Sequence, residues 1–173
     1  MMKHFFFLSL VALLSASCGE PEKGPDTVPE WNQERSTKMN KDFAVEEDLN
    51  IRLYLSRHEG WHVESTGSGL RYIRMKEGKG PQAKAGQEAK VQYVVTLLDG
   101  TECYRTKADE LEIFKIDKST IETGIQEGIK KMHVGEKAKL IIPSHLAHGL
   151  IGDLDRIPPL TQIVVDIELF ELL

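Results

Sequence analysis

The side chains best suited to chemistry in this chain are two histidines and one internal cysteine. His145 and His148 are three residues apart, and Asp153 or Asp155 follows them, so a metal site is one hypothesis. Two histidines in a polar loop are more often solvated than bound to metal, and no second pair with ligand spacing accompanies them. Cys103 has no triad-like neighbours, and the chain has no glycine-rich phosphate loop and no paired-cysteine motif. We therefore expect no bound metal and no cofactor.

The charge balance argues against a nucleic-acid-binding surface. The chain has 173 residues, 22 basic and 27 acidic side chains, and a formal net charge of −5. Nucleic-acid binders normally carry a basic face or a polybasic arm, and no such run is present. The length suits one modest core rather than two large domains. We expect no nucleic-acid partner.

Residues 1–17 have the pattern of an export signal. A positive start precedes an apolar run of about ten residues and then small residues, whereas a membrane-spanning helix needs about 20 apolar residues. Cys18 follows the small residues as in a bacterial lipobox, although Ser15 stands where leucine is common. We predict that Cys18 is lipidated and anchors the exported chain to an envelope membrane, on the periplasmic face or the cell surface. Ordinary signal cleavage is the alternative.

Residues 18–38 are expected to form an acidic tether. They contain too few apolar side chains to offset the entropy of ordering, so the segment would set the distance of the rest of the chain from the membrane. Once residues 1–17 are removed, Cys103 is the only cysteine besides Cys18. No intramolecular disulfide is then expected, and stability must come from packing.

The elements that would position a site begin with a helical segment at residues 39–66. Its apolar residues recur at three- and four-residue steps, which is typical of an amphipathic helix that ends near Gly60. The apolar face could pack on the downstream domain or pair with a second copy of the chain. The residues of this face are Val45, Leu49, Ile51, Tyr54 and Leu55.

From residue 67 onward the pattern changes to short strands around one helix. In residues 88–98, Val91, Tyr93, Val95 and Leu97 alternate onto one face, and Asp99-Gly100 supplies a hairpin turn. Further strands are expected at residues 70–76, 113–116, 138–142 and 161–172, the last nearly continuous in apolar residues and therefore central. A helical stripe contains Ile121, Ile125, Ile129 and Met132, and Ser144 is expected to cap a short helical turn. The pattern predicts an α+β fold in which an antiparallel sheet wraps around one helix.

Six sequence blocks in this region occur in the order found in one protein family. They are Val-Gln-Tyr at 91–93, Leu-Asp-Gly at 98–100, Gly-Ile-Gln-Glu-Gly at 124–128, Val-Gly-Glu-Lys-Ala-Lys-Leu-Ile-Ile-Pro-Ser at 134–144, Ile-Pro-Pro at 157–159 and Asp-Ile-Glu-Leu at 166–169. Residues 67–173 resemble an FKBP-type peptidyl-prolyl isomerase domain, which implies a twisted antiparallel half-barrel on one short helix. The lipobox and tether are similar to those of membrane-anchored bacterial members, among them a gliding-motility-associated subgroup. The resemblance implies that the partners are proline-containing segments of exported proteins.

The chemistry implied is rotation about an X-Pro peptide bond, whose barrier is about 18–20 kcal/mol. As the amide twists, resonance is lost and charge leaves the carbonyl oxygen, so a dry apolar pocket favours the twisted state over the planar one. This reaction needs no nucleophile, metal or proton donor, which agrees with the lack of such motifs.

Some family pocket positions match this chain directly. Tyr93 matches the tyrosine of the pocket wall, and it would also serve as an ordinary inward-facing aromatic residue of a strand. Ile121 matches the apolar position before the helix, and Ile157 matches the pocket-lining isoleucine. The backbone N–H of Glu122 stands where the family donates a hydrogen bond to a substrate carbonyl. Phe114 is a further candidate for substrate contact, with Leu111 or Ile113 as alternatives after a small register change.

Other family positions carry different residues here. Ile125 stands in place of the tryptophan that floors the pocket, and Val165 replaces an aromatic residue of the last strand. His148 replaces a tyrosine that donates a hydrogen bond to the ligand, and a solvated loop histidine is an equally weighted alternative. Cys103 and Tyr104 stand where Phe and Asp are common, and a one-residue bulge would turn Tyr104 inward. These replacements favour a competing hypothesis, a peptide-binding or chaperone module with weak or no catalysis.

Overall fold

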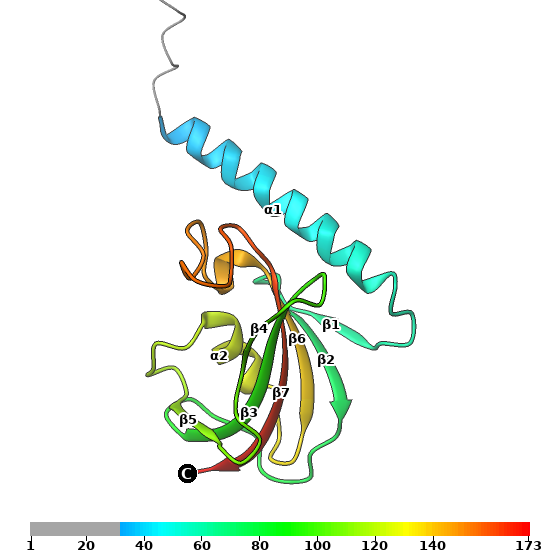
Figure 1. Cartoon of the computed structure of the whole chain (residues 1–173), viewed down its shortest axis with the longest axis vertical. Helices are drawn as coiled ribbons and strands as arrows, with labels where there is room; N and C mark the ends of the chain where they lie inside the picture. Colours follow the sequence, from blue (N-terminus) through cyan, green and yellow to red (C-terminus); the bar gives the residue numbers. More distant parts are fainter. Residues whose placement is uncertain (1–31) are drawn as a thin grey trace, which may run out of the picture.

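The computed structural model describes residues 32–173 as a curved antiparallel sheet with one helix on each side (Figure 1). The predictions for the export signal, for lipidation of Cys18 and for the first part of the tether concern residues outside this range. Within residues 32–173, no helix combines the length and the apolar character needed to cross a bilayer. The elements are α1 (Gln33–Leu55), β1 (Val63–Ser65), β2 (Arg71–Lys76), β3 (Glu88–Leu97), β4 (Glu102–Arg105), β5 (Glu112–Lys115), α2 (Thr123–Ile129), β6 (Lys137–Ile142), the 3-10 turn η1 (Ser144–Leu146) and β7 (Ile163–Leu172).

The seven strands form one sheet in the order β1-β2-β6-β7-β3-β4, and β5 also pairs with β3. All pairings are antiparallel, and β7 lies between β6 and β3, so the prediction of a central last strand is confirmed. The Asp99-Gly100 turn joins β3 to β4, with Gly100 at a φ of 91° that disfavours other residues. The predicted α+β class is confirmed.

The main core lies between the inner face of the sheet and α2. Alternate residues of β3 and β7 face this core, as the period of two requires, and Ile125 and Ile129 of α2 pack onto them. Gly124 and Gly128 let α2 approach β6 closely. An added Cβ would stand 2.3 Å from Ile142 Cγ2 at the first position and 2.5 Å from Leu140 Cδ1 at the second.

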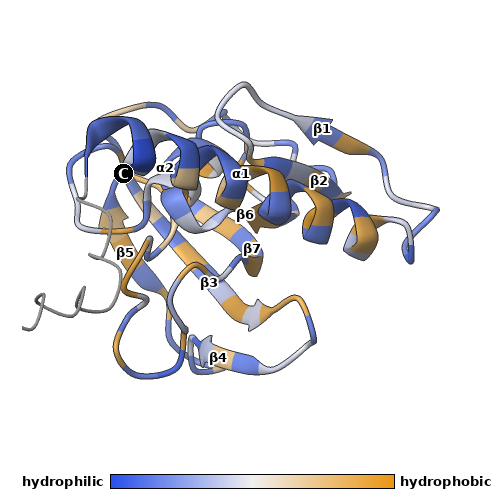
Figure 2. Ribbon diagram, turned by 90° about the horizontal axis from the view of Figure 1, so that it is seen from above, coloured by the Kyte–Doolittle hydropathy of each residue, from blue (hydrophilic) through white to orange (hydrophobic). Residues whose placement is uncertain are grey.

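Helix α1 covers part of the outer face of the same sheet (Figures 1 and 2). Ile51 packs there with residues from β2, β6 and β7, and Tyr54 and Leu55 extend the contact. The predicted apolar stripe is therefore only partly correct, because Val45 and Leu49 are exposed. The buried residues of α1 are Glu47 and Ile51, which are four residues apart and lie on one side of the helix.

The helix also differs in extent from the prediction. It begins at Gln33 rather than near residue 39, so its first six residues belong to the expected tether, because the Asn32 side chain caps it by accepting the Arg35 N–H. It ends at Leu55, before Gly60. In addition, β1 pairs with β2, so the sheet begins inside the segment 39–66 that was expected to be helical.

Candidate active site

A small apolar cavity lies between the inner face of β3, the start of α2 and the loop that follows η1. Its volume is about 80 Å³. One water needs about 10–15 Å³ of such space, so the cavity admits a group of several heavy atoms, such as a small ring. The residues that line it are Tyr93, Val95, Tyr104, Phe114, Ile121, Glu122, Ile125, His148, Ile157 and Ile163.

Tyr93 projects from β3 into the cavity wall, with its hydroxyl already engaged. The hydroxyl donates a hydrogen bond to Glu112 Oε2 at 2.6 Å. Burial, that hydrogen bond and the charges of Glu112 and Glu122 raise the pKa of Tyr93 well above its ordinary value. The hydroxyl therefore stays protonated at neutral pH, and Tyr93 offers the cavity its ring rather than an acidic proton.

The start of α2 places Glu122 at the edge of the cavity. The Glu122 carboxylate lies 3.2 Å from His148 Nε2, and both side chains are about one quarter exposed, at 24% and 22%. Among residues 32–173, no acceptor takes the backbone N–H of Glu122. That N–H is available to a ligand. His148 is not simply a solvated residue of the loop, because it lines the cavity and faces the Glu122 carboxylate.

Tyr104 reaches the cavity because β4 contains a bulge. Val95 pairs with Tyr104 and Thr96 pairs with Glu102, which leaves Cys103 as the extra residue. The one-residue bulge that the sequence analysis gave as the condition for an inward Tyr104 is thus present in the structure. It directs the Tyr104 ring to the cavity and buries Cys103 in the core, where burial raises the pKa of the thiol.

Asp153 organises the loop that carries Ile157. Its Oδ1 accepts the backbone N–H groups of Asp155, Arg156 and Ile157 at 2.9, 2.9 and 2.7 Å, and its Oδ2 accepts the Tyr104 hydroxyl. Burial opposes ionisation, but these hydrogen bonds outweigh it and hold the pKa of Asp153 below its ordinary value. The same bond, together with burial, raises the pKa of Tyr104 to about 12.

The guanidinium of Arg156 completes this arrangement. It lies 5.3 Å from the centre of the Tyr104 ring, and its Nη1 donates to the Cys103 carbonyl at 2.7 Å. The loop is therefore joined to the β4 bulge by a carboxylate, a guanidinium and an aromatic face. Nothing in the spacing of Tyr104 and Asp153, 49 residues apart, signals this contact.

The structure brings together eight of the ten residues expected at the pocket and corrects two. Val165 is fully buried in the core and Cys103 is buried beside the loop, and neither lines the cavity. Val95 and Ile163 line it instead. The alternation of β3 would have indicated Val95, which faces the same side as Tyr93, whereas Ile163 lies two residues nearer than Val165 to the cavity end of β7.

The structure also shows which of the three candidate residues near β5 lines the cavity. Phe114 is buried and lines the cavity, whereas Leu111 and Ile113 are exposed at 40% and 54% and do not replace it. Phe114 pairs opposite Ala89 of β3, whose small side chain leaves space for the ring.

The metal hypothesis finds no support in the part of the chain that the structure describes. Residues 32–173 contain no group of three or more His, Cys, Asp or Glu side chains arranged to hold an ion. His145 Nε2 is hydrogen-bonded to the Ser68 carbonyl at 2.9 Å, His148 faces Glu122, and Asp153 is occupied by the loop.

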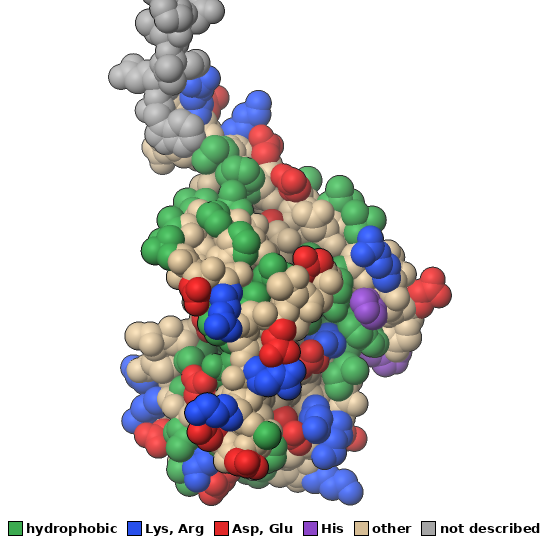
Figure 3. Space-filling model, in the orientation of Figure 1, with side chains coloured by type: hydrophobic (Ala, Val, Ile, Leu, Met, Phe, Trp, Pro, Cys, Tyr) green, Lys and Arg blue, Asp and Glu red, His purple; other side chains and the backbone are tan. Residues whose placement is uncertain are grey.

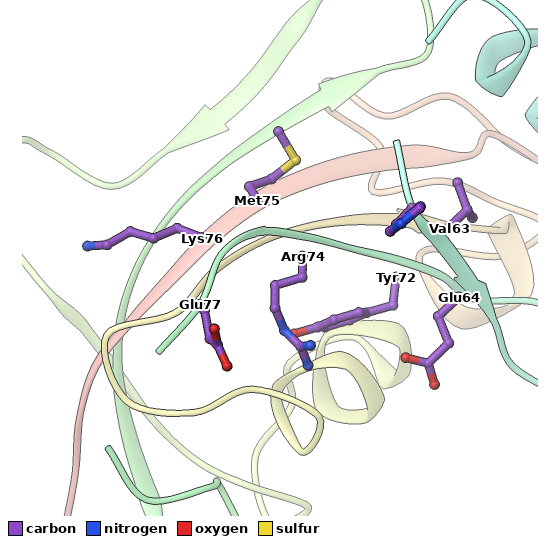
Figure 4. A pocket seen from close by; sticks show the side chains of 8 residues that line it. Val63, Glu64, Tyr72, Arg74, Met75, Lys76 and Glu77 are labelled. Carbon is purple, nitrogen blue, oxygen red and sulfur yellow. The ribbon is translucent and has the colours of Figure 1, made fainter. Parts of the chain in front are cut away.

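A larger hollow of about 540 Å³ lies beside β1 and β2 and has a different character. Figure 4 shows the Tyr72 ring and the Arg74 guanidinium side by side in it. Both donate to Glu136, a fully buried carboxylate that also accepts the His133 N–H. Burial alone would raise the pKa of Glu136, but these hydrogen bonds lower it. Half of the residues that line the hollow are charged, namely Glu64, Arg74, Lys76 and Glu77, so it gives a proline ring no apolar enclosure.

Comparison with known proteins agrees with this geometry. A family model described as FKBP-type peptidyl-prolyl cis-trans isomerase matches residues 80–170. The FKBP-type peptidyl-prolyl cis-trans isomerase FkpA of Aeromonas hydrophila is 38% identical over 141 residues, covering 80% of this chain and 51% of that protein. FkpA of Escherichia coli K12 is 35% identical over 138 residues, covering 78% of this chain and 49% of that protein. The chain spans about half the length of these curated relatives.

Solved structures give the same result for the fold. The crystal structure of FkpA from Escherichia coli has a TM-score of 0.65 at 33% identity, covering 79% of this chain and 63% of that one. A peptidyl-prolyl cis-trans isomerase from Pseudomonas syringae pv. tomato has a TM-score of 0.60 at 26% identity, covering 83% of this chain and 97% of that one. Both likenesses extend beyond the 80–170 region, so they include part of the segment before it.

Proposed function

The chain belongs to the family of FKBP-type peptidyl-prolyl cis-trans isomerases, and we propose that it catalyses the isomerisation of X-Pro bonds in exported proteins. One observation carries this proposal: the side chains of β3, β5, α2 and the 147–162 loop converge on one small, mostly apolar cavity. The cavity has the size for a proline ring. Residues 32–173 contain no group of metal ligands, and the buried Cys103 does not line the cavity.

The mechanism follows from the polarity of the cavity. A planar X-Pro amide has a more polar carbonyl than the twisted form, so enclosure by Phe114, Ile121 and Ile157 penalises the planar form more. The unpaired N–H of Glu122 at the cavity edge would hold a substrate carbonyl and fix the peptide on one side of the bond. The other side of the bond is then free to rotate.

The proposed site of action is an envelope membrane. Residues 1–17 have the pattern of an export signal, and lipidation at Cys18 would anchor the chain by acyl groups, each buried methylene contributing about 0.8 kcal/mol. Radioactive or mass-labelled palmitate incorporation, compared between the natural chain and Cys18→Ala, tests this part separately. Equal labelling of the two would overturn it.

A protease-coupled isomerisation assay tests the catalytic proposal. Tetrapeptides with different residues before proline are offered to the full chain and to an Ile157→Ala, Tyr93→Ala double variant. We expect accelerated isomerisation that the double variant loses while it keeps its far-UV circular dichroism spectrum. Leu111→Ala, which alters an exposed apolar residue outside the cavity, is the matched control and should keep its activity.

A peptide-binding module without turnover is the second candidate. The observation that favours it is the floor of the cavity, where Ile125 offers less flat surface than an indole for stacking against a proline ring. In addition, Glu122 competes with any ligand for the His148 ring nitrogen. A folded chain that binds proline peptides in titration but accelerates none of them would establish this alternative.

A further inference from the structure

Helix α1 makes one buried polar contact with the domain that carries the cavity. Glu47 is only 6% exposed although it is charged, and its carboxylate meets Ser144, 97 residues later, itself 3% exposed. Glu47 Oε2 accepts the Ser144 N–H at 3.1 Å, and Oε1 accepts the Ser144 hydroxyl. Ser144 does not cap η1 as the sequence suggested, because its hydroxyl is turned to α1 instead. A buried carboxylate needs such donors, so the contact defines where α1 docks.

Ser144 is also the point from which the cavity loop is held. Its carbonyl accepts the N–H groups of Ala147 and Gly149 at 2.9 and 2.8 Å, and the Gly149 carbonyl accepts the Leu160 N–H at 2.9 Å. The residues that face the cavity, His148 and Ile157, lie within this hydrogen-bonded loop. All hydrogen-bonding groups of Ser144 are thus used, some toward α1 and some toward the loop.

A second set of contacts links α1 to the turn at residues 66–69, which is also hydrogen-bonded to His145 next to Ser144. Asp48 accepts a hydrogen bond from Arg71 at 2.6 Å, and Arg71 donates another to the Gly69 carbonyl at 2.6 Å. Next to Gly69, the Ser68 carbonyl is hydrogen-bonded to His145 at 2.9 Å. Glu47 therefore contacts the start of the loop directly, whereas Asp48 is linked through Arg71 to the turn at residues 66–69.

Apart from the Glu47–Ser144 contact, α1 and the cavity loop are incompletely packed against each other. A groove of about 410 Å³ separates α1 from the loop next to Glu47, lined by Phe43, Gly149 and Leu150 among others. Leu150, Ile151 and Leu154 of the loop are exposed at 61%, 65% and 86%. Figure 3 shows hydrophobic side chains gathered on this face, below α1. Because packing between α1 and the loop is incomplete, the Glu47–Ser144 hydrogen bonds carry much of the attachment.

We propose that Glu47 is a positioning residue for the isomerase cavity, acting through Ser144 to hold the loop with His148 and Ile157 in place. The role rests on the isomerase activity proposed above. Glu47 lies outside residues 80–170, the part that matches the family model. If Glu47 positions the loop, α1 contributes to the function of the site and is not only a spacer. Undocking of α1 would lower the fraction of molecules with a formed cavity.

This role has a kinetic signature that differs from a loss of stability. If only a fraction of the molecules has a formed cavity, apparent affinity falls in proportion to that fraction, while substrate at saturation still selects the formed state. Loss of the contact should therefore raise KM and leave kcat nearly unchanged. A variant that is merely less stable but fully folded at the assay temperature changes neither constant.

The test uses variants of the full chain. For Glu47→Ala we expect about a tenfold rise in KM with kcat within about twofold, and amide exchange about tenfold faster at residues 145–160 than in the natural chain. Glu47→Gln, whose amide oxygen still accepts the Ser144 N–H, should show a smaller rise and so a partial rescue. Ser144→Ala, a smaller change at the other partner, should raise KM in the same direction. Glu46→Ala, the exposed neighbour on α1, is the matched control and should behave as the natural chain.

The outcomes separate this inference from the proposed function. If KM and loop exchange in Glu47→Ala match those in Glu46→Ala, or if exchange accelerates throughout the sheet instead of in the loop, the positioning role is wrong. If the natural chain accelerates no peptide, the isomerase proposal fails. The exchange comparison then still decides whether Glu47 holds the loop: faster exchange confined to residues 145–160 supports the attachment, and unchanged exchange overturns it.

Discussion

Replacement of Asp153 by alanine tests how the cavity loop is built. The carboxylate accepts three backbone N–H groups of its own loop and the hydroxyl of Tyr104 on β4. Alanine removes all four acceptor contacts at once, and the N–H of Ile157 loses the bond that holds its residue against the cavity. We therefore expect both the stability and the isomerase activity to fall.

The magnitude follows from the three backbone hydrogen bonds. Each net hydrogen bond contributes about 0.5–1.5 kcal/mol, and the loop is partly exposed, which favours the lower half of that range through competition with water. We expect Asp153→Ala to lower the free energy of unfolding by about 1.5–3 kcal/mol. Displacement of Ile157 should lower kcat/KM by about tenfold or more, since small misplacements of a positioning group are costly.

The pH dependence gives an independent check. Hydrogen bonding holds the pKa of Asp153 below its ordinary value of 3.8, so folding favours the ionised form. The stabilisation is therefore fully present above that value and is lost as the pH falls through the lower pKa of the folded state. The difference in free energy of unfolding between the natural chain and Asp153→Asn should be constant near neutral pH. It should shrink as the pH falls below 3.8, the ordinary pKa of the carboxyl group.

Urea unfolding followed by tryptophan fluorescence, together with the coupled isomerisation assay, measures both effects. Asp155→Ala is the matched control, because its carboxylate is 70% exposed and lies 3.6 Å from Arg156. We expect the control to change stability by less than about 0.5 kcal/mol. If Asp153→Ala behaves like Asp155→Ala in both measurements, the reasoning about this loop is refuted.

Three further substitutions test the core and the buried carboxylate. Ile157→Ala should lower the free energy of unfolding in urea by about 2–4 kcal/mol, because the side chain is 2% exposed, whereas the exposed Ile113→Ala should not. Gly128→Ala should lower the free energy of unfolding by about 1–3 kcal/mol in a thermal unfolding experiment, because the added Cβ would stand 2.5 Å from Leu140 Cδ1. An unchanged Tm would mean that α2 can shift freely. Glu136→Ala should cost about 3–5 kcal/mol in urea, because it leaves buried donors unpaired. A loss below 1 kcal/mol would show that water replaces the carboxylate.

The cavity itself was largely predictable because most of its parts are set by local spacing. Tyr93 and Val95 share a face by the period of two in β3, and Ile125 follows from the helical stripe of α2. Ile121 precedes α2, which begins at Thr123, and the family resemblance supplied it. The order of the six sequence blocks supplied Ile157 and His148 through the family resemblance. Val165 was misplaced because the resemblance aligns positions along β7 but does not say how far down the strand the cavity extends.

The contacts that hold the site together were not predictable in this way. The sequence shows an acidic patch in α1 and a serine after Pro143, but not that Glu47 reaches Ser144. From the sequence, Asp153 was only a candidate, with Asp155, for a metal site that we did not expect, and in the structure it accepts donors from its own loop and from Tyr104. A carboxylate needs donors, and its sequence neighbours do not reveal which distant strand or helix supplies them.

The sequence by itself determined the inward-facing residues of β3, the approximate positions of β2, β3, β5, β6, β7 and α2, and that the domain is α+β, because these depend on periodicity within short segments. Only the tertiary structure decided which part of the α1 stripe is buried, how the β4 bulge turns Tyr104 inward, and which donor each buried carboxylate receives. These features depend on groups that are distant in the chain and meet only after the sheet has curved around α2. Periodicity specifies a face, whereas the pairing of charges and hydrogen bonds across that face is a property of the folded arrangement.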